Sequence, residues 1–181
     1  MYKKYISLLE QQGVQLEKGL TQEEIELAEK IYDIKFPKSL SEFLMTALPV
    51  SKDFYNWRNM EESNVRFIKQ MIELPKMNIY NEADEIYWND EWGEEPENII
   101  EFITLVREKL VNAPKLIPIF AHRYIPMVNG EEIPILSIHG VDVIYYAKTL
   151  EEYINAEFLG INKKFSSLDE YMYVPFWSDI M

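Results

Sequence analysis

The hydrophobic pattern of this chain changes its period once, near Leu116. N-terminal to that residue, apolar side chains recur at the three- and four-residue spacing of amphipathic helices. C-terminal to it, short β-rich runs such as LIPIF and DVIYYA are separated by turn residues, which is typical of an antiparallel sheet. Helices followed by a sheet and a closing helix predict an α+β protein. We expect a single domain over residues 1–181, with an antiparallel or mixed sheet flanked by helices.

Helix boundaries are marked in the N-terminal part of the chain. Residues 2–12 suit a short amphipathic helix. Thr21 and Glu24 form a capping-box pattern, in which each side chain accepts a hydrogen bond from the other residue's free backbone N–H, so a second helix is predicted to start there. Another helix follows Pro37, a residue that the first helical turn tolerates, and its apolar stripe runs to Ala47.

Three further helices are predicted beyond these. One covers about residues 63–74, and another opens at Pro96 and ends before Pro114. Thr149 and Glu152 repeat the capping-box pattern and open the helix that follows the sheet.

Two aromatic stretches are expected to be structural. Trp57 lies in the turn-rich run VSKDFYNWRNM, where a tryptophan usually plugs the end of a core. The C-terminal run YMYVPFW is expected to pack against the rest of the chain rather than extend from it.

The charge of the chain restricts its partners. Eighteen basic and 31 acidic side chains give 18 − 31 = −13 at pH 7. So acidic a surface repels phosphate backbones and attracts cationic molecules. Nucleic acid is therefore not an expected partner, whereas a basic protein is.

Other features restrict the compartment and the chemistry. The chain has no cysteine, which excludes disulfides, thiolate nucleophiles and zinc–thiolate sites. Its N-terminal run MYKKYISLLEQQG has no sustained apolar core, and no run approaches the roughly 18 apolar residues of a membrane span. We expect a cytoplasmic protein that does not bind membranes, and no oligomeric state is predicted.

Both histidines fall in the predicted sheet, and neither has a companion at metal-ligand spacing, so no metal and no cofactor are predicted. Strand alternation places His139 on the face opposite Leu136 and Ile138. We interpret it as a polar-face residue beside the HGVD turn. An acid–base dyad of His139 with Asp142 is a competing interpretation, but it has no identified nucleophile.

A polar triplet, His122, Arg123 and Tyr124, separates the apolar runs LIPIFA and IPMV. The guanidinium of Arg123 can hold a carboxylate bidentately, in a ligand or within the protein. We favour an internal salt bridge that fixes the sheet over a ligand clamp.

The run NEADEIYWNDEWGEEPEN is rich in carboxylates but does not follow EF-hand calcium spacing, so we interpret it as a solvated acidic loop. Trp88 and Trp92 lie inside it, close to Glu94 and Glu95. Aromatic anchors with carboxylate steering groups would suit a contact surface for a basic protein. In the competing interpretation, both indole rings pack onto the neighbouring helix.

The run GLTQEEIELAEKIYDIKFPKSLSEFL is similar to the N-terminal signature of the SUKH superfamily, which includes the Smi/Knr cell-wall regulators and bacterial immunity proteins. The pattern is an amphipathic helix followed by spaced apolar residues: Ile34, Phe36, Pro37, Leu40, Phe43 and Leu44. The runs LIPIFAHRYIPM and PILSIHGVDVIYYAKTLEEYI resemble the family's sheet and closing helix, so the similarity is strongest over residues 19–158. The HGVD hairpin and the long acidic loop depart from the family pattern.

The resemblance implies an α+β domain that binds other proteins, and no catalytic residue is carried over from the family to this chain. Many bacterial members are immunity proteins that neutralise toxins, often nucleases. A nuclease is basic in order to hold its substrate, so an inhibitor charged −13 would be steered toward it. We therefore expect a non-catalytic immunity protein for a basic toxin. The predicted partner-binding surface consists of Trp88, Trp92, Glu94, Glu95, His122, Arg123 and Tyr124.

Two other functions stay open at this point. One is a small-molecule-binding or regulatory domain with a pocket between sheet and helices, lined by Tyr145, Tyr146 and Arg123. The other is a hydrolase that uses His139 and Asp142.

Overall fold

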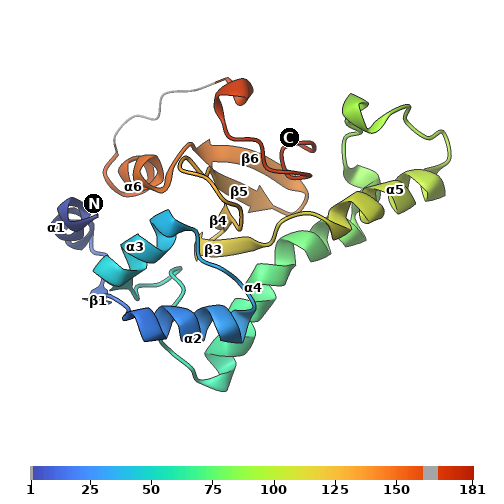
Figure 1. The fold of residues 1–181 in the computed structure, drawn as a ribbon. Coiled ribbons are helices and arrows are strands. Elements are labelled where there is room, and N and C mark those ends of the chain that lie inside the picture. Colours follow the sequence, from blue (N-terminus) through green and yellow to red (C-terminus); the bar gives the residue numbers. More distant parts are fainter. Residues whose placement is uncertain (1, 161–166) are drawn as a thin grey trace.

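A four-stranded antiparallel sheet forms the middle layer of the molecule, with helices on both of its faces (Figure 1). The structure is a computed structural model that describes residues 2–160 and 167–181. The strands are β3 (Leu116–Phe120), β4 (Arg123–Pro126), β5 (Ile135–His139) and β6 (Asp142–Ala147). Each strand pairs with the next along the chain. This meander confirms the predicted α+β class and the antiparallel sheet.

Helices precede and follow the sheet, as the sequence predicts. The α-helices found within the described residues are α1 (Lys3–Gln11), α2 (Gln22–Tyr32), α3 (Lys38–Thr46), α4 (Glu62–Asn81), α5 (Ile99–Val111) and α6 (Leu150–Phe158). Short 3-10 turns are η1 (Ala83–Glu85), η2 (Asp90–Trp92) and η3 (Leu168–Glu170). No helix in the described ranges is long and apolar enough to cross a membrane.

The sheet separates two apolar cores because successive side chains of a strand point to opposite faces. Core 1 contains Ile117 and Ile135 and is covered by α1, α2, α3 and α6. Core 2 contains Leu116 and Leu136 and is covered by α5 and by residues 174–180 at the C-terminal end. Helix α4 packs along β3 and contributes its first half to core 1 and its second half to core 2. Burial of each such aliphatic side chain stabilises the fold by about 1.5–3 kcal/mol.

The first predicted capping box is present in full. The hydroxyl of Thr21 accepts a hydrogen bond from the Glu24 N–H at 3.2 Å, and the Glu24 carboxylate accepts one from the Thr21 N–H at 2.8 Å. At α6 only half of the box is as predicted. Thr149 accepts from the Glu152 N–H, but the Glu152 carboxylate accepts from the Lys148 N–H, one residue earlier.

Three helix boundaries differ from the prediction. Helix α4 continues through the buried Pro75 to Asn81, because its apolar stripe goes on to pack against the sheet. Helix α5 begins at Ile99 rather than at Pro96, because the Asn98 side chain accepts hydrogen bonds from the first free N–H groups. Ala47 leaves the helical stripe and starts strand β2 (Ala47–Pro49), which pairs with β1 (Leu16–Lys18) in a small sheet that the sequence did not predict.

Both aromatic stretches pack as expected. Trp57 is 2% exposed and lies edge-on to Phe36 and Tyr32, at ring-centroid distances of 5.0 and 5.3 Å. In the C-terminal segment Trp177 is fully buried, and its indole N–H donates to the carbonyl oxygen of Pro114 at 2.9 Å. The last residues therefore complete core 2.

Candidate functional site

The acidic segment, residues 81–98, joins α4 to α5 at the right-hand edge of the molecule in the view of Figure 1, where it is pale green. It carries eight carboxylates and no lysine or arginine: Glu82, Asp84, Glu85, Asp90, Glu91, Glu94, Glu95 and Glu97. All eight are exposed, and none takes part in the ion pairs found among the described residues. The segment is thus a concentrated source of negative potential.

The two tryptophans fix this segment to the body of the protein. Trp88 and Trp92 are half-buried, and their rings are perpendicular, with centroids 5.3 Å apart. Trp88 lies 5.3 Å from Phe102 of α5, and Trp92 stacks on Phe176 at 6.0 Å. Trp88 therefore packs onto the neighbouring helix, as the competing interpretation predicts, whereas Trp92 stacks on the C-terminal segment instead. Both rings anchor the acidic segment internally.

Hydrogen bonds hold the acidic segment in the same place. The Trp88 indole N–H donates to the Gly93 carbonyl oxygen at 2.8 Å. The Asn89 side chain donates to the backbone carbonyl of Asp179 at 2.9 Å, and the Trp92 indole N–H donates to the Asp179 carboxylate at 3.3 Å. The carboxylates of this segment are therefore presented on a fixed support.

The exposed aromatic residue of the acidic segment is Tyr87, which was not among the predicted site residues. Its side chain is 86% exposed, whereas the preceding Ile86 is 6% exposed and belongs to core 2. Burial of Ile86 turns Tyr87 outward. An exposed tyrosine surrounded by carboxylates is a typical anchor at protein interfaces.

The polar triplet does not form one surface. His122 is exposed in the turn between β3 and β4, and Arg123 is half-buried. Tyr124 is 2% exposed and packs in core 2, and this burial raises the pKa of its hydroxyl. The prediction that Tyr124 contacts a partner is wrong, because strand alternation places it on the covered face of β4.

Arg123 makes the internal contacts that were favoured for it. Its Nε lies 3.5 Å from Oε2 of Glu157 on α6, and its Nη1 donates to the Ser137 hydroxyl at 2.9 Å. The guanidinium also sits 4.0 Å from the ring centroid of Tyr146. These contacts join three strands to α6 on the core 1 face of the sheet, which is a structural role.

The two halves of the predicted surface lie apart. The acidic segment packs against core 2 through Trp88 and Trp92, whereas Arg123 faces α6 on the core 1 side. In the described part of the chain, no hydrogen bond or ion pair joins the acidic segment to the triplet. Glu94 and Glu95 therefore belong to a different surface from His122 and Arg123.

The fold brings the two histidines together although 17 residues separate them in sequence. Their ring centroids are 6.4 Å apart and the rings are perpendicular. Partial burial and the nearby Arg123 charge lower the pKa of His122. His139 pairs with Asp142 in the strand register at the end of the β5–β6 hairpin, and no hydrogen bond found among the described side chains joins them. Within the described ranges, no three His, Asp or Glu side chains are placed to hold a metal ion.

Tyr145 and Tyr146 do not line one pocket between the sheet and the helices, as the small-molecule hypothesis requires. The Tyr146 ring packs at core 1, whereas Tyr145 packs at core 2 and stacks on Tyr171 at 4.3 Å. Adjacent residues of a strand point to opposite faces, so the two tyrosines cannot line one pocket.

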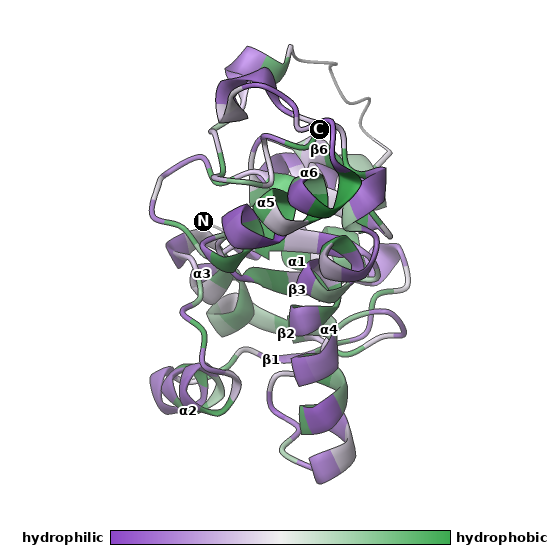
Figure 2. Cartoon of the chain, turned by 90° about the vertical axis from the view of Figure 1, so that its right-hand side faces the viewer, coloured by the Kyte–Doolittle hydropathy of each residue, from purple (hydrophilic) through white to green (hydrophobic). Residues whose placement is uncertain are grey.

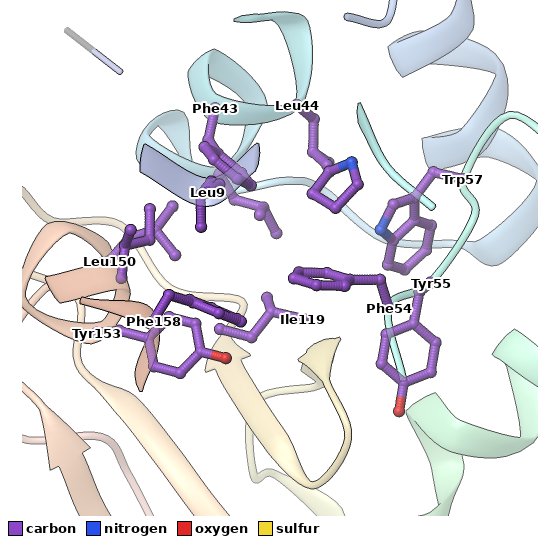
Figure 3. Close-up of a pocket in the computed structure, with 13 residues that line it drawn as sticks. Leu9, Phe43, Leu44, Phe54, Tyr55, Trp57, Ile119, Leu150, Tyr153 and Phe158 are labelled. Carbon is purple, nitrogen blue, oxygen red and sulfur yellow. The ribbon is translucent and has the colours of Figure 1, made fainter. Parts of the chain in front are cut away.

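Core 1 does contain a small cavity between the sheet and the helices (Figure 3). Side chains from α1, α3, β3 and α6 converge on it, and the rings of Phe54 and Phe158 point toward its centre. Its volume is about 20 Å³, which is room for roughly one water molecule and far below the 300–1,000 Å³ of typical ligand pockets.

Comparisons with known proteins identify no relative of this chain. No protein-family model matches the chain, and searches of curated proteins and of solved structures also give no match. The similarity to the SUKH superfamily therefore rests on the sequence motifs alone.

Proposed function

We propose that this protein binds a basic protein stoichiometrically through the acidic segment, and that it acts in the cytoplasm as an immunity protein against a basic toxin. The observation that carries the proposal is a set of eight exposed carboxylates that form no ion pair with any described residue. They share the tryptophan-anchored acidic segment with the exposed Tyr87. Nucleic acid and membranes are not the proposed partners.

Binding would proceed in two stages: the carboxylates attract the cationic partner, and the partner then contacts a segment that is already ordered. Unpaired carboxylates attract a cationic partner and raise its association rate, and their effect falls as salt rises. Because Trp88 and Trp92 already hold the segment in place, little conformational entropy is lost on binding. Tyr87 supplies the apolar contact that charges alone do not provide.

The sequence resemblance supports the same class of partner. Immunity proteins of the SUKH superfamily neutralise toxins that are often nucleases, and a nuclease must be basic at the site that holds its substrate. A binder charged −13 is complementary to such a site.

A basic toxin domain encoded in the neighbourhood of this protein's gene is the first partner to test, by calorimetry and by survival of cells that express both proteins. The triple variant Glu94→Lys, Glu95→Lys, Glu97→Lys should weaken the complex at least tenfold, about 1.4 kcal/mol, and remove protection. Tyr87→Ala should have a similar effect through lost contact area.

The matched control is Glu131→Lys, Glu132→Lys, Asp169→Lys, which makes the same change in net charge at exposed carboxylates elsewhere. It should retain nearly full affinity at physiological salt. Equal weakening by both triple variants would show that net charge, and not the acidic segment, is responsible. Unchanged affinity in the first triple variant would rule out the acidic segment as the binding site.

A further inference from the structure

Helix α5 carries two strongly exposed aliphatic residues on the side that faces away from core 2. Ile100 and Val111 are 73% and 75% exposed, although both are large aliphatic residues. Together with Thr104 and Arg107 they form one row along the helix, which we name the α5 stripe. In Figure 2, α5 lies toward the viewer and hydrophobic segments interrupt its hydrophilic surface.

The surroundings of the α5 stripe enlarge this apolar area. Met77 and Tyr80 of α4 lie beside Val111 and are each 52% exposed. They help to line a groove of about 500 Å³ between α4 and α5, and a second groove of about 320 Å³ lies along Ile100 and Thr104. Exposed apolar side chains gathered beside such grooves are typical of interaction sites in soluble proteins.

The spacing of the α5 stripe has the period of a paired helix. Its members are separated by four, three and four residues, which is the spacing of the contact positions in a two-helix coiled coil. The order four, three, four also reads the same in both directions. A second copy of the same helix therefore fits it in the antiparallel orientation, as a two-fold axis requires.

We propose that two copies of this chain pair through the α5 stripe, with their α5 helices antiparallel about a two-fold axis. In that register Ile100 of each copy meets Val111 of the other. The two-fold axis makes this contact at both ends of the pairing, so the most exposed aliphatic residues of both helices become buried. Arg107 of each copy meets Thr104 of the other at the centre.

The charges on α5 are complementary in the same register. Thr104 is flanked on the helix surface by Glu101 and Glu108, which lie one turn before and after it and are both exposed. Arg107 of the second copy is thus placed between two carboxylates, and none of these three residues takes part in the ion pairs found in the described ranges. Within its own chain, Arg107 donates from Nε to the Tyr80 carbonyl oxygen at 3.0 Å, and its guanidinium lies 4.1 Å from the Tyr80 ring centroid. These contacts limit the positions that its side chain can take.

This pairing is independent of the proposed toxin binding, because it uses α5 and not the acidic segment. Repulsion between two chains of charge −13 opposes it, so we expect a reversible dimer with a dissociation constant in about the micromolar range.

Disulfide cross-linking tests the orientation directly, because the chain has no cysteine of its own. The double variant Ile100→Cys, Val111→Cys should form a covalent dimer on mild oxidation, since the two positions face each other across the axis. Neither single variant should form a covalent dimer, because each cysteine and its own copy lie about 16 Å apart along the paired helices. Failure of the double variant to cross-link, or equal cross-linking of the single variants, would overturn the antiparallel pairing.

Analytical ultracentrifugation over a range of protein concentrations tests the dimer without cross-linking. The wild-type mass should rise from one chain toward two, and Ile100→Lys should raise the dissociation constant by roughly tenfold or more. Leu27→Lys, at a 45% exposed leucine on α2, is the matched control and should dimerise like the wild type. A wild-type protein that stays monomeric at every concentration, or an Ile100→Lys variant that dimerises normally with an unchanged circular-dichroism spectrum, would refute the proposal.

Discussion

At the scale of single residues, Arg123 is a candidate ligand-binding group that instead pairs with Glu157 inside the protein. Its side chain is 13% exposed and that of Glu157 is 21% exposed, so both charges are largely removed from water. Such a pair contributes little over two apolar residues, but loss of one partner leaves the other as an uncompensated buried charge. The Tyr153 hydroxyl is buried beside them, and its pKa is raised by burial and by Glu157.

Substitution of one partner should therefore destabilise the protein more than substitution of both. We expect Arg123→Met and Glu157→Met each to lower the free energy of unfolding by about 2–4 kcal/mol, and the double variant to lie within about 1 kcal/mol of the wild type. Urea denaturation of the four proteins measures this coupling. If Arg123→Met leaves the stability unchanged, Arg123 is not an internal partner and the ligand-clamp interpretation gains support.

At the scale of secondary-structure elements, Arg58 connects three parts of the chain that are separate in sequence. Its guanidinium donates to the Glu24 carboxylate at 2.6 and 3.2 Å, to Glu17 at 3.0 Å, and to the backbone carbonyl groups of Lys18 and Gly19. Since Glu24 also caps α2, Arg58 ties β1 and the α2 N-terminus to the segment before α4.

Loss of Arg58 should weaken this junction in a pH-dependent way. The Arg58 hydrogen bonds, and then the Thr21 N–H, lower the pKa of the Glu24 carboxyl. A lowered pKa in the folded state contributes stability above the unfolded-state pKa, near 4.3, that is lost as pH falls through the folded value.

We expect Arg58→Ala to cost about 1–2 kcal/mol at pH 7, and this cost to shrink as the pH is taken below about 4.3. Thermal denaturation at pH 7 and pH 3 measures both values. The control is Arg66→Ala, which removes an exposed pair with Glu62 and should cost no more than about 0.5 kcal/mol. A pH-independent cost at Arg58 would contradict the assigned role of Glu24.

Local signals made most elements predictable from the sequence. The Thr21 capping box, the apolar stripes and the change of period near Leu116 depend on neighbouring residues, so they identify the helices and the meander directly. The β1–β2 pair escaped prediction because strands of three residues are too short to show alternation. It also depends on Gly19, where a Cβ atom would overlap the carbonyl oxygen of Met45.

At the scale of the whole molecule, the candidate site was only partly predictable. Composition indicates an acidic binder, and the structure places the acidic segment at one edge, as expected for an accessible surface. Which side chains face outward depends on contacts between distant segments. Trp92 stacks on Phe176, and Tyr124 is buried in core 2, so neither ring is free to contact a partner. Tyr87 stays exposed. No local pattern contains that information.

The proposed function requires that the acidic segment bind a basic protein in a fixed stoichiometry. Its most direct test is isothermal titration of the wild-type protein with a basic toxin domain encoded near its gene, at 50 mM and at 300 mM salt. We expect one toxin domain to bind per chain, with an affinity that falls at the higher salt concentration. Absence of binding at 50 mM salt, or an affinity that does not change with salt, would contradict it.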